Sequence, residues 1–242
     1  MSQPAAEDGA DTVRLSLVMP VFNEADVLPA TLERLAGLTL PIPWELIVVD
    51  DGSTDGGVDG IEPSGIPGAE RVRVLRQDVN RGKGAAIRLG FAAAEGDILG
   101  VQDADLEYDP ADIAALLAPL IEGRADAVFG TRTRGGYVPY SRWYALGNQV
   151  LGAAAAVMFG RHVSDLYTGY KFIRRPAYER LRLTANGFDI EAEIGSRLFL
   201  TRARVVEVPV RYEARSREAG KKLRPSDGLR GLVRLIRVRV GR

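Results

Sequence analysis

The sequence predicts an α/β domain with a mostly parallel sheet flanked by helices. Short apolar runs rich in β-branched residues alternate with longer segments of helical periodicity through the first half of the chain. This order is typical of βαβ units, whose parallel strands are joined by right-handed crossovers. Polar clusters follow four of the apolar runs, and ligands of such sheets bind at the carboxyl ends of the strands. We therefore expect one site at one edge of the sheet.

The first half of the chain contains five expected strands and three expected helices. The strands are expected at residues 15–20, 44–51, 71–77, 97–103 and 125–130, and the helices at 24–38, 82–96 and 110–123. The alternating pattern of 71–77, "RVRVLRQ", indicates a more exposed strand than the others. Gly96 is a plausible stop for the second helix, and Pro110 suits the first turn of the third.

The second half is less regular. We expect helices at 140–159, near 189–200 and from about Asp227, and a strand within 203–214. The alanine-rich stretch "VLGAAAAVMFG" is shorter than the roughly 18 residues of a transmembrane helix, and its composition favours a close-packed internal helix. The basic final helix has apolar residues at helical spacing, which suits either packing on the domain or contact with a membrane surface.

Composition limits the kinds of chemistry available. The 242 residues are 46% hydrophobic, enough for one sizeable core, and they include no cysteine and a single histidine, His162. Disulfides, thiolate nucleophiles and multi-histidine metal sites are therefore excluded. Residues 1–13 are polar, lack the order of a signal peptide and are expected to be a disordered tail. The expected location is the cytoplasm, with the protein soluble or peripheral on the membrane face.

Charge is balanced overall, with 32 basic and 32 acidic residues, which gives no indication of nucleic-acid binding. The local distribution is uneven. Residues 89–123 contain eight acids and no lysine or arginine, whereas residues 211–242 contain eleven bases and three acids. An acidic region and a basic region in one domain predict a metal site that faces an anion site.

The acidic region centres on "VQDADLEYDP" at residues 101–110, directly after an expected buried strand. Asp109 followed by proline is explained as a helix cap. That explanation does not cover Asp103, Asp105 and Glu107. An EF-hand loop would require glycine at the position of Tyr108, which excludes it. The remaining interpretation is an oxygen-ligand site for Mg²⁺ or Mn²⁺ that is open to substrate phosphates.

A glycine-rich segment, "NRGKGAAIRLG", leads into the second expected helix. Its glycine spacing matches neither a Walker motif nor the dinucleotide fingerprint, in which Ile87 would have to be glycine. A glycine-rich helix entry nevertheless predicts backbone N–H groups and Lys83 near an anion.

Taken in order, five segments of the chain resemble glycosyltransferase family 2, which has the GT-A fold. They are "PVFNE", "DDGSTDG", "NRGKGAAIRLG", "QDADLEYDP" and "GTR". The sequence is most similar to the branch of dolichyl-phosphate mannose and glucose synthases and their bacterial polyprenyl-phosphate relatives. The resemblance runs from about Leu15 to Leu235. It implies a single GT-A domain over 14–242, with a nucleotide-sugar half at about 14–132 and an acceptor half at about 133–242.

The resemblance also implies roles for individual residues. It implies that Asp103, Asp105 and Glu107 bind the metal ion, with Asp105 and Arg215 acting in catalysis. The donor nucleotide-sugar is implied to be held by Pro20, Phe22, Glu24, Val49, Asp51, Lys83, Asp103, Ala104, Arg132 and Lys222. Among these, Arg132 and Lys222, together with Arg215, would contact phosphates. Phe22 stands where the family commonly has tyrosine, and Arg217 is an alternative to Arg215.

Three functions remain open at this point. The first is inverting transfer of a hexose from UDP-glucose-like or GDP-mannose donors to a polyprenyl or dolichyl phosphate, at a membrane surface. An acceptor phosphate has a second pKa of about 6 and needs no general base. The second is transfer to a hydroxyl of a saccharide or metabolite, for which Asp165 in "SDLYTG" is the candidate base. The third is a non-catalytic nucleotide- or metal-binding module. The sequence leaves the oligomeric state undetermined.

Overall fold

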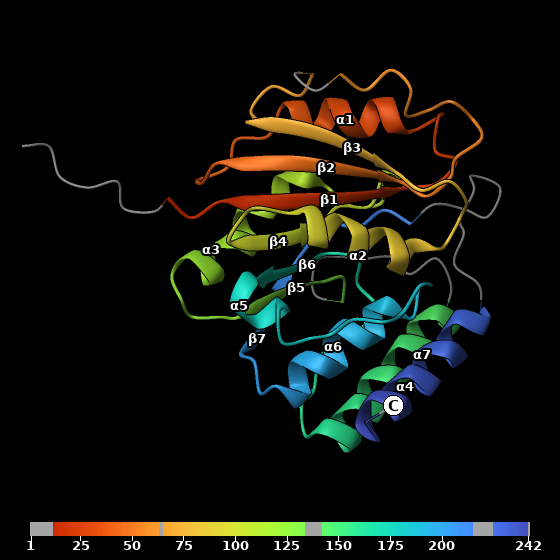
Figure 1. The fold of residues 1–242 in the computed structure, drawn as a ribbon. Helices are drawn as coiled ribbons and strands as arrows, with labels where there is room; N and C mark the ends of the chain where they lie inside the picture. The colour runs from red at the N-terminus through yellow and green to blue at the C-terminus, as the bar shows by residue number, and fades with distance from the viewer. Residues whose placement is uncertain (1–11, 63–64, 134–141, 215–224, 242) are drawn as a thin grey trace, which may run out of the picture.

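The computed structural model describes residues 12–62, 65–133, 142–214 and 225–241. A seven-stranded sheet with the order β3-β2-β1-β4-β6-β5-β7 forms its centre (Figure 1). The strands are β1 (Leu15–Val21), β2 (Trp44–Asp50), β3 (Arg71–Arg76), β4 (Ile98–Val101), β5 (Ala127–Thr131), β6 (Lys171–Arg174) and β7 (Val205–Pro209). β6 runs antiparallel to β4 and β5, and the other neighbouring pairs are parallel. The expected mostly parallel α/β fold is confirmed.

Helices cover both faces of this sheet (Figure 1). They are α1 (Leu28–Ala36), α2 (Lys83–Ala93), α3 (Ile113–Ile121), α4 (Arg142–Phe159), α5 (Arg175–Tyr178), α6 (Ile190–Leu200) and α7 (Pro225–Arg239), with a 3-10 turn at Pro110–Asp112. Alternate side chains of a strand point to opposite faces, and each face has its own core. Leu46 of β2 packs into the core covered by α1 and α3, and Ile47 into the core covered by α2, α4, α6 and α7. This sandwich fixes the strand ends that carry the polar clusters.

The strand β6 was not expected from the sequence. It is only four residues long, and its first residue, Lys171, is a fully buried cation in an otherwise apolar run. Strand β3 lies at the sheet edge and is partly exposed, as its alternating pattern predicts.

Two expected helix details are wrong. α1 begins at Leu28, and the residues before it form a turn in which the carbonyl of Glu24 accepts hydrogen bonds from the N–H groups of Val27 and Leu28. α2 ends at Ala93, so Gly96 is not its stop. Gly96 instead passes close to the start of β1, where an added Cβ would lie 2.7 Å from the Ser16 nitrogen.

The alanine-rich helix α4 is only half internal, which corrects the expectation of a close-packed interior helix. Leu151 and Ala155 are buried against the core, whereas Val157 is 87% exposed on the other side. α4 lies beside α7, and both have one face on the domain (Figure 1). Within the described residues, no helix combines the length and apolar character needed to cross a membrane. The expected tail lies almost wholly outside the described residues.

Candidate active site

The carboxyl end of β4 leads into a tightly held acidic loop. Gln102 is buried and accepts a hydrogen bond of 2.6 Å from the Tyr170 hydroxyl, while its side-chain amide donates to the carbonyl of Asp103 at 2.9 Å. The next turn is sharp, because Leu106 has a φ of 61°, in the left-handed region, and the Glu107 N–H donates to Oδ1 of Asp105. These contacts fix the positions of the aspartates at the sheet edge.

Burial makes the ionised form of the two aspartates in this loop less favourable. The pKa of Asp105 is raised to about 7 by burial and by the nearby charges of Asp103 and Glu107. Burial raises the pKa of Asp103 as well, against the opposing effect of Lys83. No cation lies near this loop in the sequence, but Lys83 Nζ is 2.7 Å from Asp103 Oδ1 in space. The acidic loop is therefore partly neutralised from helix α2.

The three acids do not form a ready-made metal site. Among the described residues, no group of three acidic or histidine side chains is arranged to hold a metal ion. Asp103 is paired with Lys83, and Glu107 accepts a short hydrogen bond from the Tyr212 hydroxyl. The chemistry of the donors still fits Mg²⁺ or Mn²⁺, which prefer carboxylate oxygens, and a cation would relieve the repulsion at Asp105. Each contact uses one oxygen of its carboxylate, Oδ1 of Asp103 and Oε2 of Glu107, so a metal ion would compete there with Lys83 and Tyr212.

The start of helix α2 is not an open anion site, which corrects the sequence-based expectation. The N–H groups of Gly84 and Ala85 donate to the carbonyl of Asn186, at 2.7 and 3.2 Å. Those of Arg81 and Gly82 donate to the carboxylate of Asp51, at 2.7 and 2.8 Å. The side chain of Lys83 is therefore the group at this helix start that remains directed at the acidic loop.

Residues expected to hold the donor lie at the same edge of the sheet but differ in accessibility. Pro20, Phe22 and Glu24, at and after the end of β1, are partly exposed. The side chain of Val49 is fully buried against helix α2, and its expected contact with the donor stays a prediction. The Ala104 side chain is also buried, and its carbonyl accepts a hydrogen bond from the Thr31 hydroxyl.

Asp51 is buried, and both of its carboxylate oxygens are used within the protein. They accept hydrogen bonds from the Gln77 side chain and from the backbone before α2. Burial is the main reason why the pKa of Asp51 is raised. Asp51 therefore holds the loop that delivers Lys83, and its expected nucleotide contact stays a prediction.

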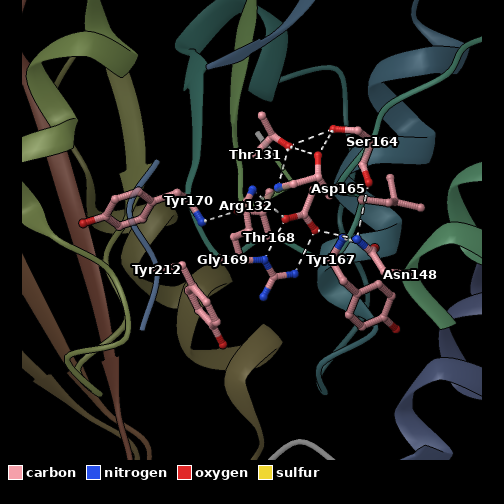
Figure 2. A network of polar contacts seen from close by, with 12 residues as sticks. Thr131, Arg132, Asn148, Ser164, Asp165, Tyr167, Thr168, Gly169, Tyr170 and Tyr212 are labelled. Atoms are coloured by element: carbon pink, nitrogen blue, oxygen red, sulfur yellow. Dashed lines mark hydrogen bonds and ion pairs between the residues drawn. The ribbon is translucent and has the colours of Figure 1, made fainter. Parts of the chain in front are cut away.

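A second buried pair joins the end of β5 to the segment 164–170 (Figure 2). Arg132 donates from Nε to Asp165 Oδ2 at 2.6 Å and from Nη2 to Oδ1 at 2.8 Å. Asn148 of α4 donates to Oδ1 as well, at 2.8 Å. The Arg132 guanidinium lies 4.8 Å from the centre of the Tyr212 ring. This arrangement anchors three parts of the chain to one carboxylate.

This geometry favours an anchoring role for Asp165 over the general-base role expected from the sequence. Its side chain is fully buried, and both oxygens are occupied. Burial alone would raise the pKa of Asp165, but the ion pair and hydrogen bonds with Arg132 outweigh it and hold the pKa below its usual value. Arg132 is bound to Asp165 through two of its nitrogens, and its contact with phosphate stays a prediction. Arg215, Arg217 and Lys222 lie outside the described residues.

Comparison with known proteins decides the family. Residues 16–182 match the family described as Glycosyl transferase family 2. The chain belongs to this family. The family 2 resemblance read from the sequence is therefore confirmed, and it places the chain among transferases rather than among binding modules.

Two curated relatives of this family 2 protein have names that refer to lipid phosphates. The dolichol-phosphate mannosyltransferase of Pyrococcus furiosus is 28% identical over 213 residues, covering 86% of this chain and 59% of the relative. The dodecaprenyl-phosphate galacturonate synthase of Rhizobium johnstonii is 36% identical over 128 residues, covering 52% of this chain and 38% of the relative. The chain thus spans less than two thirds of either relative.

A solved structure supports the GT-A fold of the family 2 domain. Glucosyl-3-phosphoglycerate synthase from Mycobacterium tuberculosis, in complex with Mn²⁺, UDP and glucosyl-3-phosphoglycerate, superposes with a TM-score of 0.71. The sequences are 26% identical, and the match covers 95% of this chain and 79% of the other.

Sequence reasoning missed two charged residues behind the acidic loop of this family 2 domain. Glu191 on α6 and Lys171 on β6 are buried and form an ion pair of 2.7 Å. Lys171 interrupts the apolar run "YKFI", whereas Glu191 lies in "DIEAEI", where acids alternate with apolar residues. A charge at a buried position points to a partner. The partner itself could not be read from the sequence.

We expect Asp165→Asn to reduce stability rather than remove a base. Leaving the buried Arg132 without its carboxylate should cost about 3–5 kcal/mol of unfolding free energy. Denaturant unfolding measures this loss. Asp126→Asn is the matched control, because Asp126 makes a similar fork with Arg204 at an exposed position and should cost much less. Equal losses in the two variants would contradict a structural role for the buried pair.

Proposed function

We propose that this protein transfers a hexose from a nucleoside-diphosphate sugar to a polyprenyl or dolichyl phosphate, with inversion and with Mg²⁺ or Mn²⁺. The observation that carries the choice of acceptor is the sequestration of Asp165 by Arg132. A hydroxyl acceptor requires a general base. A phosphate acceptor is largely dianionic at neutral pH and attacks without one. The names of the curated relatives agree with a lipid-phosphate acceptor.

The metal ion would be held by Asp103 and Asp105, with Glu107 as the third carboxylate. Bound there, it would neutralise the charge that develops on the departing nucleoside diphosphate. Lys83 supplies a cation beside the same aspartates. Fixed positive charges directed at a developing anion lower the barrier because they need little reorganisation during the reaction. We assign Arg215 and Lys222 to the phosphates as well, on the family resemblance.

A second candidate is transfer to a hydroxyl of a small phosphorylated metabolite. The structural likeness to glucosyl-3-phosphoglycerate synthase favours it, since that match covers 95% of this chain. This reaction would need a base other than Asp165. Asp105 does not suit that role if it binds the metal ion. The lipid-phosphate acceptor is therefore our first choice, and the donor base and sugar are to be determined by assay.

The transfer reaction is tested by incubating the protein with labelled UDP-glucose or GDP-mannose and either polyprenyl phosphate or 3-phosphoglycerate. We expect label in the lipid fraction with Mg²⁺ or Mn²⁺, and none in excess chelator. Asp105→Asn should lower the rate by roughly 100-fold or more, while Asp97→Asn, at the opposite end of β4, should leave it unchanged. Label in the phosphoglycerate product alone would favour the second candidate. Full activity in chelator would contradict the metal proposal.

We further propose that α4 and α7 form the face that meets the lipid. Three apolar residues of α7 and the residue that follows it are between 40% and 67% exposed: Leu229, Val233, Ile236 and Val240. They recur at helical spacing on the side opposite the buried Leu235. On the neighbouring α4, Val150 and Val157 are exposed as well.

The charges around this face suit an anionic membrane. Arg230, Arg237 and Arg239 are exposed on α7, and the helix has one acid, Asp227, which is buried. A second copy docked on the same face would bring arginines against arginines. A surface of anionic lipid would instead pair with them, at about 1 kcal/mol for each basic side chain near the headgroups.

Membrane docking is tested by co-sedimentation with vesicles of phosphatidylcholine, with and without phosphatidylglycerol. We expect binding to the anionic vesicles that weakens with salt, because the electrostatic part is screened. Ile236→Ser should weaken binding to the anionic vesicles on the order of tenfold, because it removes roughly 1–2 kcal/mol of apolar burial in the membrane. Ile121→Ser, on the exposed side of α3, is the matched control and should have no effect. Equal effects of the two substitutions would contradict this docking face.

A further inference from the structure

Four charged side chains of alternating sign lead from the interior to the acidic loop. Lys171 Nζ is 2.7 Å from one oxygen of Glu191, and Lys83 Nζ is 3.0 Å from the other. Lys83 is in turn 2.7 Å from Asp103. The exposed fraction of the side chains rises along this series from 0% at Lys171 to 4%, 13% and 16% at Asp103. The series therefore has an inner, fixed end and an outer end at the proposed metal site.

The inner end is held by the fold. Lys171, on the central strand β6, also donates to the carbonyls of Leu166 and Thr168, which fixes it to the segment that contains Asp165. Glu191 lies in the first turn of α6. Its Oε1 receives no hydrogen bond of good geometry from a described residue, so the ion pair with Lys83 is what compensates its burial. Glu191 is thus built into the domain and directed at Lys83.

Lys83 pairs with two carboxylates, and only one of them, Asp103, belongs to the proposed metal site. Asp103 is expected to bind a divalent cation, which would compete with the lysine for that carboxylate. Without another anion, Lys83 would be left unpaired beside a metal ion and would be driven from the site by repulsion. Glu191 remains as a partner throughout. Its position allows the ammonium group to stay in place while its other partner changes.

We propose that Glu191 is a positioning residue: it retains Lys83 at the site while the lysine exchanges Asp103 for a diphosphate oxygen of the donor. This inference rests on the proposed function in requiring a metal ion and a nucleotide, but it does not depend on the sugar or the acceptor. Glu191 itself would contact neither substrate nor metal ion. Its effect passes through the position of Lys83.

The experiment measures binding without transfer. Glu191→Gln and wild-type protein are titrated with Mn²⁺ alone, and then with UDP or GDP in the presence of Mn²⁺, by calorimetry. We expect the variant to bind Mn²⁺ and the nucleotide 10- to 100-fold more weakly, the usual range when a residue that orients a metal ligand is removed. Lys83, held only by Asp103, would compete more strongly with the metal ion for that carboxylate.

Glu45→Gln is the matched control. Glu45 is likewise a buried glutamate between two cations, Arg71 and Arg73, but it lies at the amino end of β2, away from the site. Both variants should lose thermal stability, whereas only Glu191→Gln should lose binding. A purely structural role for Glu191 would lower stability in the same way and leave both dissociation constants unchanged, which would overturn the proposal.

A second variant covers the case in which Glu191→Gln does not fold. Glu191→Asp keeps the buried charge but shortens the side chain by one methylene group, so the carboxylate no longer spans both lysines. We expect weaker Mn²⁺ and nucleotide binding in this variant too, and wild-type affinity would overturn the proposal. If wild-type protein binds neither Mn²⁺ nor nucleotide, the inference fails with the metal site. Tight binding of Mn²⁺ and nucleotide without transfer to polyprenyl phosphate would contradict only the proposed acceptor.

Discussion

Buried charge must be paired, and this constraint organises the structure around the acidic edge of the sheet. An isolated ionised group in a protein interior costs several kcal/mol, so each buried acid needs a cation or a set of hydrogen-bond donors. Asp103 is paired with Lys83, Asp165 with Arg132 and Glu191 with two lysines. The partners come from helices and strands that are distant in sequence. Pairing these charges therefore joins the two halves of the domain.

The topology of the sheet explains why these groups meet at one edge. β1, β2 and β4 are parallel neighbours, so the loops after them emerge on the same side. The antiparallel β6 then brings Lys171 and the segment before it against β4 and β5. The nucleotide, metal ion and acceptor phosphate that we propose as ligands all carry charge. The pair of Lys83 and Asp103 is placed to exchange partners with them, whereas the pairs Asp165–Arg132 and Glu191–Lys171 hold the surrounding structure in place.

Much of the fold could be predicted from the sequence, because strands β1, β2 and β4 and most helices are set by local apolar patterns. The acidic loop could be predicted too, since Asp103, Asp105 and Glu107 lie within five residues of one another. The ion pairs could not be predicted. Whether Asp165 is a base or a structural anchor depends on Arg132 reaching it from another strand.

The same limit applies to helix α2 and to Lys171. The glycine-rich entry of α2 is typical of an anion site, but the carbonyl of Asn186, which is distant in the sequence, accepts the hydrogen bonds of the Gly84 and Ala85 N–H groups. Lys171 interrupts a short apolar run, and for this reason strand β6 was not predicted. In both cases the local structure depends on a contact with a residue that is distant in the sequence, and local patterns do not show such contacts.

The most direct measurement is a crystal structure of this protein with Mn²⁺ and the nucleoside diphosphate that it binds. We expect Mn²⁺ on Asp103 and Asp105 at the end of β4. We also expect Lys83 Nζ within hydrogen-bond distance of both a diphosphate oxygen and Glu191. A nucleotide bound at this edge with the Lys83–Asp103 pair intact and no metal ion on the aspartates would contradict this expectation.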